Sequence, residues 1–191
     1  MSSKGEAQRQ RIVAAANKLF YQQGYESTSF SDIADLVGIS RGNFYYHFKS
    51  KDEILDAVID NRVADIKAML DEWNKKITDP KQRLYYYIEY QLRNQEDILA
   101  HGCPIGSLCT ELAKISHLML GDANKMFAVF RDWLVAQLKL VGIKKNTKQI
   151  AMHLLARGQG IATVSNAFED NEFLRQEVSR LKQWLDDEIQ Q

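Results

Sequence analysis

Apolar residues recur along much of the chain at the spacing of an α-helix. The first stretch that shows the i, i+3, i+4, i+7, i+8 pattern of an amphipathic helix consists of Ile12, Ala15, Ala16, Leu19 and Phe20. Gly24 follows this stripe, at the place where a left-handed residue commonly ends a helix. The chain has only two prolines, no alternating Val/Ile/Thr run and no Asn-Gly turn, so the pattern predicts an all-α fold.

The next elements are set by capping signals. Ser29 with Asp32 three residues later resembles a capping box, and Gly38 closes the short apolar run that follows. Ser40 can cap a third helix, which is equally short. Ser50 with Glu53 predicts the start of a fourth helix that continues to the region of Trp73, about 35 Å at the helical rise per residue. A helix of this length can join two domains.

The second half of the chain also reads as helical. Asp79-Pro80 supplies a cap and a first-turn proline for a fifth helix, which we expect to end before His101-Gly102. Four further helices are expected at about 105–118, 123–141, 147–168 and 171–188, which makes about nine in all. The chain is thus expected to hold an N-terminal domain over 6–66 and a second helical domain over 67–191.

Composition limits the class of protein. No apolar run approaches the length of a membrane span, and the polar N-terminal stretch lacks the apolar region of a secretory signal, so we expect a cytoplasmic protein without membrane contact. Cys103 and Cys109 are too few for a disulfide scaffold and are expected to be thiols. The net charge is zero, but residues 1–51 carry +3 and the remainder −3, which leaves an anionic partner open.

The stretch SRGNFYYHFKSK, residues 40–51, combines aromatic rings with basic residues around one glycine. A helix, a tight turn at Gly38 and a second helix form a helix-turn-helix, whose second helix enters the major groove of DNA. Phe44 and Phe48 can pack on the first helices as core. We expect the leading end of this helix to read bases and the later rings and amines to hold phosphates. The predicted DNA-binding residues are Ser29, Ser40, Arg41, Gly42, Asn43, Tyr45, Tyr46, His47, Lys49 and Lys51.

The segment TSFSDIADLVGISRGNFYYHFKSKDEIL, residues 28–55, resembles the helix-turn-helix of the TetR family of bacterial transcriptional repressors, with the motif at about 29–48. The family's spacing is matched by Ile33-Ala34, Gly38, Ser40, Gly42, Tyr45, His47-Phe48, Ser50-Lys51 and Leu55. Val37 and Ile39 depart slightly from the family's usual residues, and Ser31 stands where a basic residue is common. The resemblance implies a homodimer that binds a palindromic operator and is released by an unknown small-molecule inducer.

The resemblance also implies a ligand cavity and a dimer interface in the second domain. A cavity of this kind needs apolar walls with a few polar groups, although residues of the same types also fill a hydrophobic core. The candidates are Trp73, Tyr86, Tyr87, Tyr90, Cys103, Met119, Phe127, Phe130 and Trp133. By analogy with the family, the last two helices would form the dimer interface through Ala151, Leu155, Gly158, Ala162, Phe173, Val178, Leu181 and Leu185. No cofactor, metal or catalytic residue is expected.

The segment HGCPIGSLCTELA, residues 101–113, leaves several alternatives open. It resembles a branch of the family with Gly-Cys before this helix, which includes the electrophile-responsive repressor of N-ethylmaleimide reductase; in that branch the cysteine matching Cys103 is the redox sensor. Alternatively, Cys103 and Cys109 are small buried hydrophobes. A metal sensor using both cysteines with His101 and His117 fits no common zinc spacing. An enzyme using Cys103, Glu111 and a histidine, or a helical interaction module without DNA, explains less of the sequence.

Overall fold

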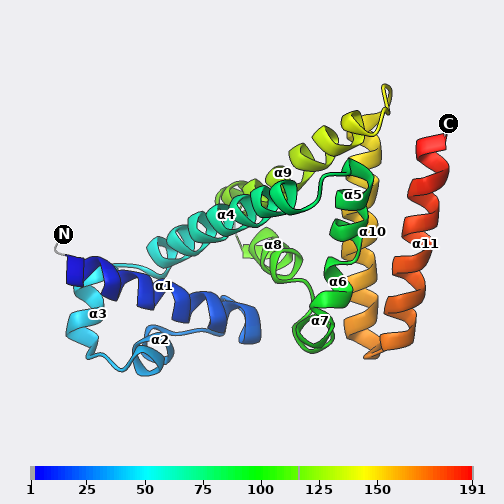
Figure 1. The fold of residues 1–191 in the computed structure, drawn as a ribbon. Helices are drawn as coiled ribbons and strands as arrows, with labels where there is room; N and C mark the ends of the chain where they lie inside the picture. Colours follow the sequence, from blue (N-terminus) through cyan, green and yellow to red (C-terminus); the bar gives the residue numbers. More distant parts are fainter. Residues whose placement is uncertain (1–2, 116, 191) are drawn as a thin grey trace. The chain divides into compact units, whose positions relative to one another are not determined.

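The computed structural model describes residues 3–115 and 117–190, and within these residues it contains helices and no strand (Figure 1). The predicted all-α fold is therefore confirmed. In chain order the helices are α1 (Ser3–Gln23), α2 (Phe30–Val37), α3 (Arg41–His47), α4 (Lys51–Lys76), α5 (Pro80–Ile88), α6 (Tyr90–Arg93), α7 (Gln95–His101), α8 (Pro104–Ile115), α9 (His117–Leu140), α10 (Thr147–Phe168) and α11 (Asn171–Gln190).

The fifth helix expected from the sequence is divided into α5, α6 and α7, so the prediction of one continuous helix was wrong. The chain leaves regular helical geometry at Asn94, which has φ −117° and ψ 26°. Side chains also bond to the backbone there: the Arg93 guanidinium donates to the Tyr86 carbonyl, and Asn94 Nδ2 donates at 2.7 Å to the Tyr90 carbonyl, which accepts the Asn94 N–H as well. Such side-chain competition for the backbone is not visible in the apolar periodicity.

The chain forms two compact units, each made of two segments. The first comprises the residues up to Asp65 together with Ser107–Asn124, and the second comprises Ile66–Gly106 together with the residues from Lys125 onward. The sequence suggested a single cut between 66 and 67, whereas α8 and α9 each contribute to both units.

In the first unit α2 packs on α1 and on α3 (Figure 1), and buried side chains from these helices form a small core. The apolar stripe of α1 is buried at Ile12, Ala16 and Phe20, as its spacing predicted. Phe44 of α3 and Phe48 after it are each only 1% exposed and complete this core. Burying two phenylalanine side chains stabilises by roughly 3–6 kcal/mol in total, which fixes a helix of only seven residues.

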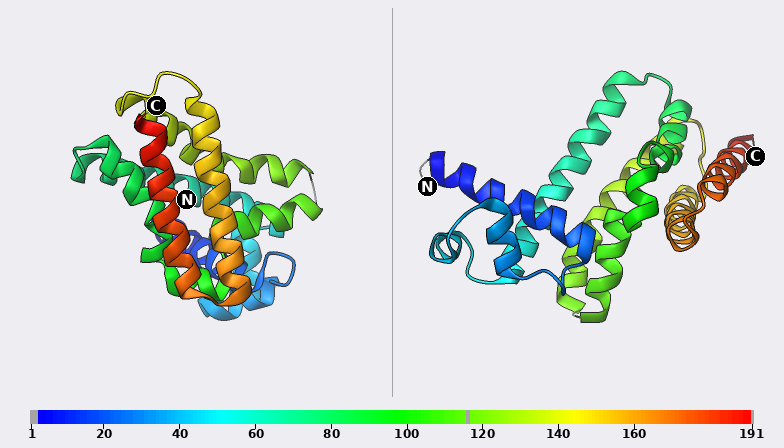
Figure 2. Two further views of the ribbon diagram at one scale, coloured as in Figure 1. Left: turned by 90° about the vertical axis from the view of Figure 1, so that its right-hand side faces the viewer. Right: turned by 90° about the horizontal axis from the view of Figure 1, so that it is seen from below.

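In the second unit α10 and α11 lie side by side (Figure 2), while α11 also contacts α5 and α6 and α10 contacts α7. An ion pair of 3.0 Å between Arg157 Nη2 and Glu177 Oε2 links the two long helices. A second ion pair joins α5 to α11, where Lys81 Nζ lies 2.7 Å from Asp186 Oδ1.

The residues predicted to form a dimer interface lie largely inside the single chain. Phe173 is partly exposed, whereas the buried members are Ala151, Leu155, Gly158, Ala162, Val178, Leu181 and Leu185. Their apolar faces are covered within the chain, because α10 and α11 pack on each other and on α5 to α7. A contact with a second copy would have to use the outer faces of these helices.

No helix within residues 3–115 and 117–190 combines the length and the apolar character needed to cross a bilayer.

Candidate DNA-binding interface

The turn between α2 and α3 is fixed by the capping residues that the sequence indicated. Ser29 Oγ accepts the Asp32 N–H at 3.2 Å, and the Asp32 carboxylate accepts the Ser29 N–H at 2.7 Å. The hydrogen bond from the Ser29 backbone, followed by that from its hydroxyl, lowers the pKa of Asp32. At the other end of α2, Gly38 adopts φ 74°, ψ 42°, and its N–H donates to the carbonyls of Ala34 and Asp35. Ser40 Oγ then accepts the Asn43 N–H at 3.3 Å and starts α3.

The rings of α3 divide into a buried and an exposed set. Phe44 is buried against Phe30, with ring centroids 5.1 Å apart. Tyr45 and Tyr46 are exposed by 46% and 68%. The first three residues of the helix are also exposed: Arg41, Gly42 and Asn43. One face of α3 thus belongs to the core and the other presents polar groups suited to base edges and phosphates.

Arg41 is held by a contact that the sequence analysis missed. Its Nη2 donates to Ser31 Oγ of α2 at 2.8 Å, although the two residues are ten positions apart. Ser31 is the position where the TetR family often has a basic residue. Here its hydroxyl orients the arginine, a role that hydroxyl chemistry allows but that no local sequence signal reveals.

The residues after α3 are engaged with the start of α4. The Lys49 ammonium donates to the Tyr45 carbonyl, and the Lys49 N–H donates to Glu53 Oε2 at 2.7 Å. Ser50 Oγ accepts the Glu53 N–H at 3.1 Å, as predicted, but the Glu53 carboxylate accepts the backbone N–H of Lys49 and not that of Ser50. His47 Nδ1 is buried and has no hydrogen-bond partner among the residues that the structure describes.

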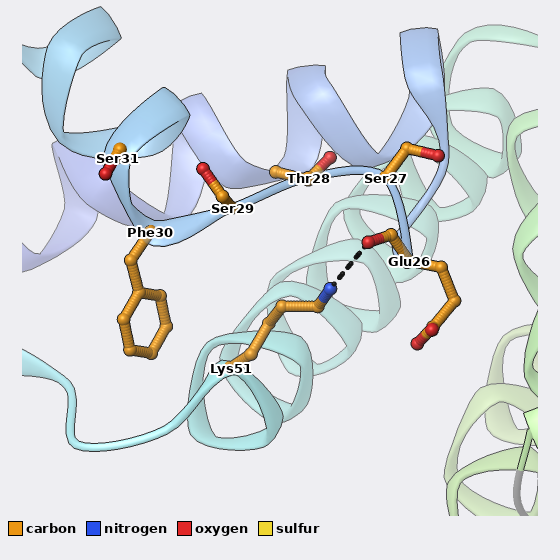
Figure 3. Close-up of a pocket in the computed structure, with 7 residues that line it drawn as sticks. All are labelled: Glu26, Ser27, Thr28, Ser29, Phe30, Ser31 and Lys51. Atoms are coloured by element: carbon orange, nitrogen blue, oxygen red, sulfur yellow. Dashed lines mark hydrogen bonds between the residues drawn. The ribbon is translucent and has the colours of Figure 1, made fainter.

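A shallow hollow of about 460 Å³ lies beside the start of α2 (Figure 3). Its lining residues are Glu26, Ser27, Thr28, Ser29, Phe30, Ser31 and Lys51. Lys51 Nζ donates to the Glu26 carbonyl at 3.1 Å, and its ammonium lies 4.3 Å from the centre of the Tyr25 ring. Hydroxyl groups beside an ammonium and a helix N-terminus suit the oxygens of a phosphate. The sequence named Ser29 and Lys51 but missed the loop that precedes Ser29.

In the second unit the structure brings most of the predicted cavity residues together. The Trp73 ring lies 5.0 Å from Tyr86, 6.1 Å from Tyr90 and 5.8 Å from Trp133. The Tyr87 ring adds a contact of 5.7 Å with Phe130. These rings form one aromatic cluster, which we call the tryptophan cluster.

Among the predicted cavity residues whose side chains are described, Cys103 and Phe127 are not part of the tryptophan cluster. Phe127 is partly buried on α9 and makes no ring contact with the cluster. Met119 falls within 116–120, whose side chains lie outside the described residues. Burial, and to a smaller extent the nearby Cys103, raises the pKa of the Tyr87 hydroxyl, so this group remains protonated at neutral pH.

Cys103 immediately precedes α8, where the sequence placed it, and Cys109 is buried within α8. Two N–H groups point at the Cys103 sulfur: those of Gly106 and of the Gln159 side chain, each 3.4 Å from Sγ. A Cβ at Gly106 would approach Gln159 Oε1 to 2.0 Å, so glycine leaves room for this contact. No group of three or more His, Cys, Asp or Glu side chains within the described residues is arranged to hold a metal ion.

Comparisons with known proteins agree with this geometry. Residues 12–58 match the family described as "Bacterial regulatory proteins, tetR family". An uncharacterized HTH-type transcriptional regulator in the lacX 3′ region of Lactococcus lactis subsp. lactis is 28% identical over 181 residues, which cover 91% of each chain. The HTH-type transcriptional regulator TtgR of Pseudomonas putida is 43% identical over 61 residues, 31% of this chain and 29% of that protein.

Among solved structures, E. coli NemR in its reduced form superposes with a TM-score of 0.81 at 20% identity and covers 92% of this chain and 96% of its own. At this identity the likeness establishes the two-domain all-α fold alone.

Proposed function

We propose that the chain is a dimeric repressor of the TetR family of helix-turn-helix transcriptional regulators, released from a palindromic operator when a small molecule binds its second unit. The relatives are named as transcriptional regulators, so a regulatory role is the one proposed, in the bacterial cytoplasm.

The observation that carries the proposal is the surface of α3. Arg41, Gly42 and Asn43 are exposed at its leading end, while Phe44 is 1% exposed and fixes the helix from behind. A guanidinium pairs with guanine and an amide pairs with adenine in the major groove, and a glycine lets the backbone approach the base edges closely. The hollow beside α2 supplies hydroxyls and the Lys51 ammonium for the flanking phosphates.

A dimer is required by this way of reading DNA, since two recognition helices must enter successive major grooves about 34 Å apart. On α10, Val164 and Phe168 lie four residues apart on one side of the helix and are 37% and 77% exposed. We therefore assign the contact with the second copy to this side of α10, in place of the buried residues named from the sequence.

The tryptophan cluster is the proposed place of the inducer, because flat apolar rings with a few polar groups suit a small organic molecule. Trp133 Nε1 donates a hydrogen bond to Asn74 Oδ1 at 3.1 Å, and this bond orients the indole ring of Trp133. Tyr87 keeps its proton and can donate a hydrogen bond to such a ligand. A tenfold loss of operator affinity requires a coupling free energy of only about 1.4 kcal/mol.

The experiment that tests the proposal is selection of bound sequences from a random duplex library at about 0.15 M salt, because specificity is meaningful only at a stated ionic strength. We expect a palindromic consensus whose half-sites lie about one helical turn apart. A library recovered without enrichment by the ligand-free protein would contradict sequence reading by α3.

A second candidate for the inducing signal is an electrophile or oxidant that reacts with Cys103. Two observations favour this candidate: Cys103 is partly exposed, and two N–H groups lie 3.4 Å from its sulfur and hold it in place. Cys109 is 7% exposed and serves as an internal control. Limited labelling with N-ethylmaleimide, read by mass spectrometry, should modify Cys103 first and release the operator, while Cys103→Ser should bind DNA and lose the response.

A further inference from the structure

Within the first unit, the Glu111 carboxylate of α8 is directed at the loop that leads from α1 to α2. Its two oxygens accept successive backbone N–H groups, that of Tyr25 at 2.9 Å and that of Glu26 at 2.8 Å. Hydrogen bonds to an ionised carboxylate are about twice as strong as those between neutral groups. A residue 85 positions away along the chain thus fixes the backbone of this loop.

The loop is shaped to receive this carboxylate. Gly24 adopts φ +90°, and a Cβ added to it would lie 3.1 Å from Glu111 Oε1. Any other residue would strain the backbone and crowd the carboxylate, so glycine is required for two separate reasons. The close approach indicates a specific fit, which a chance contact between surface side chains would not need.

The same loop leads directly into the candidate DNA-binding interface. Thr28 Oγ1 donates to the Gly24 carbonyl at 2.6 Å, and the next residue, Ser29, caps α2. Tyr25 Oη donates to Asp52 Oδ1 at 2.7 Å in the first turn of α4. The Glu26 carbonyl accepts from Lys51 (Figure 3). The position of the loop therefore sets where α2 begins and where the Lys51 ammonium lies.

We infer that Glu111 is a positioning residue for DNA binding: it holds the loop, and through it α2 and Lys51, in the arrangement that fits the operator. The inference rests on the proposed function.

Glu111→Gln tests the inference because the two hypotheses predict opposite signs. Glutamine has nearly the same shape, but its amide group would face one of the two backbone N–H groups as a second donor. If Glu111 positions the loop, operator affinity falls by about tenfold, the change expected when a charge-assisted hydrogen bond is lost. If Glu111 is only a surface carboxylate, removal of a negative charge leaves DNA affinity unchanged or raises it.

Asp60→Asn is the matched control, since it removes the same charge from an exposed position of the first unit. It should bind the selected operator as tightly as the wild type or slightly more tightly. Amide hydrogen exchange should show faster exchange in Glu111→Gln confined to the peptide that contains Tyr25 and Glu26, at an unchanged melting temperature.

Operator affinity of Glu111→Gln equal to that of Asp60→Asn would overturn the inference. So would a loss of affinity matched by faster exchange throughout the first unit, since that outcome means general destabilisation. Wild-type protein that binds no selected sequence would instead contradict the proposed function, and the two failures are therefore distinguishable.

Discussion

Replacement of Arg41 and of Ser31 separates the reading of a base from the preparation of the side chain that reads it. Arg41→Ala removes the guanidinium at the leading end of α3 and should cost about 1–3 kcal/mol on the operator, with relaxed preference at one base pair. Ser31→Ala keeps the guanidinium but removes its acceptor, which lies 2.8 Å from Arg41 Nη2.

The expected size of the Ser31→Ala effect follows from the geometry. Both residues of the pair lie at the surface, so the hydrogen bond holds a mobile side chain and buries little. Immobilising one long side chain costs about 0.5–1.5 kcal/mol, and Ser31→Ala should lose no more than this, a factor of about two to ten in operator affinity. Affinity for random duplex should not change, because no phosphate-binding charge is removed.

The assay is a titration of labelled operator, of operators with single base changes, and of random duplex, followed by fluorescence anisotropy at fixed salt. Double replacement of Arg41 and Ser31 by alanine should be no worse than Arg41→Ala alone, because Ser31 acts through the arginine. If both single variants weaken operator and random duplex by the same factor, neither residue contributes to sequence reading and the division of roles on α3 is refuted.

Three further variants test other parts of the structure. Lys51→Ala should weaken operator and random duplex alike and flatten the salt dependence of binding, and a selective loss on the operator would contradict its phosphate role. Gly38→Ala should lower the free energy of unfolding in urea by about 1–2 kcal/mol, because alanine would have to adopt the left-handed φ of 74°. Gly42→Ala is the control, since both glycines have open space for an added Cβ and Gly42 has no positive φ. Hydrogen bonds from Lys81, then from Tyr85, lower the pKa of Asp186, so the stabilising contribution of this carboxylate is present above the usual aspartate pKa and is lost as the pH falls through the lowered pKa. The urea midpoints of wild type and Asp186→Asn should therefore converge in acid. A constant difference between the two midpoints would contradict the linkage.

Local features of the first unit could be predicted because each depends on residues three or four positions apart. The capping box of Ser29 with Asp32, the left-handed Gly38 and the cap at Ser40 all have their partners within one turn. The apolar stripe of α1 and the burial of Phe44 follow from the same short-range periodicity. The resemblance to the TetR family then supplied the function.

Contacts between distant residues could not be predicted from the same signals. Glu111 was considered only as part of a possible active site, because nothing in its neighbourhood points to the N–H groups of Tyr25 and Glu26. The contact between Gln159 and Cys103 and that between Ser31 and Arg41 are of the same kind. A polar side chain can bond to any polar group that the fold brings near, so its partner is known only once the fold is known.

The residues predicted for the dimer interface illustrate a different ambiguity, because a pattern of buried apolar positions does not identify what covers them. Apolar residues at helical spacing in α10 and α11 indicate that a face is buried, but burial by a neighbouring helix and burial by a second copy leave the same pattern. Leu155 and Leu181 are 6% and 1% exposed in the single chain, so their partner is internal. A second copy can bind only to the apolar surface that packing within the chain leaves exposed, and Phe168, at the end of α10, is 77% exposed. Replacement of Phe168 by a charged residue should therefore weaken self-association without unfolding the chain.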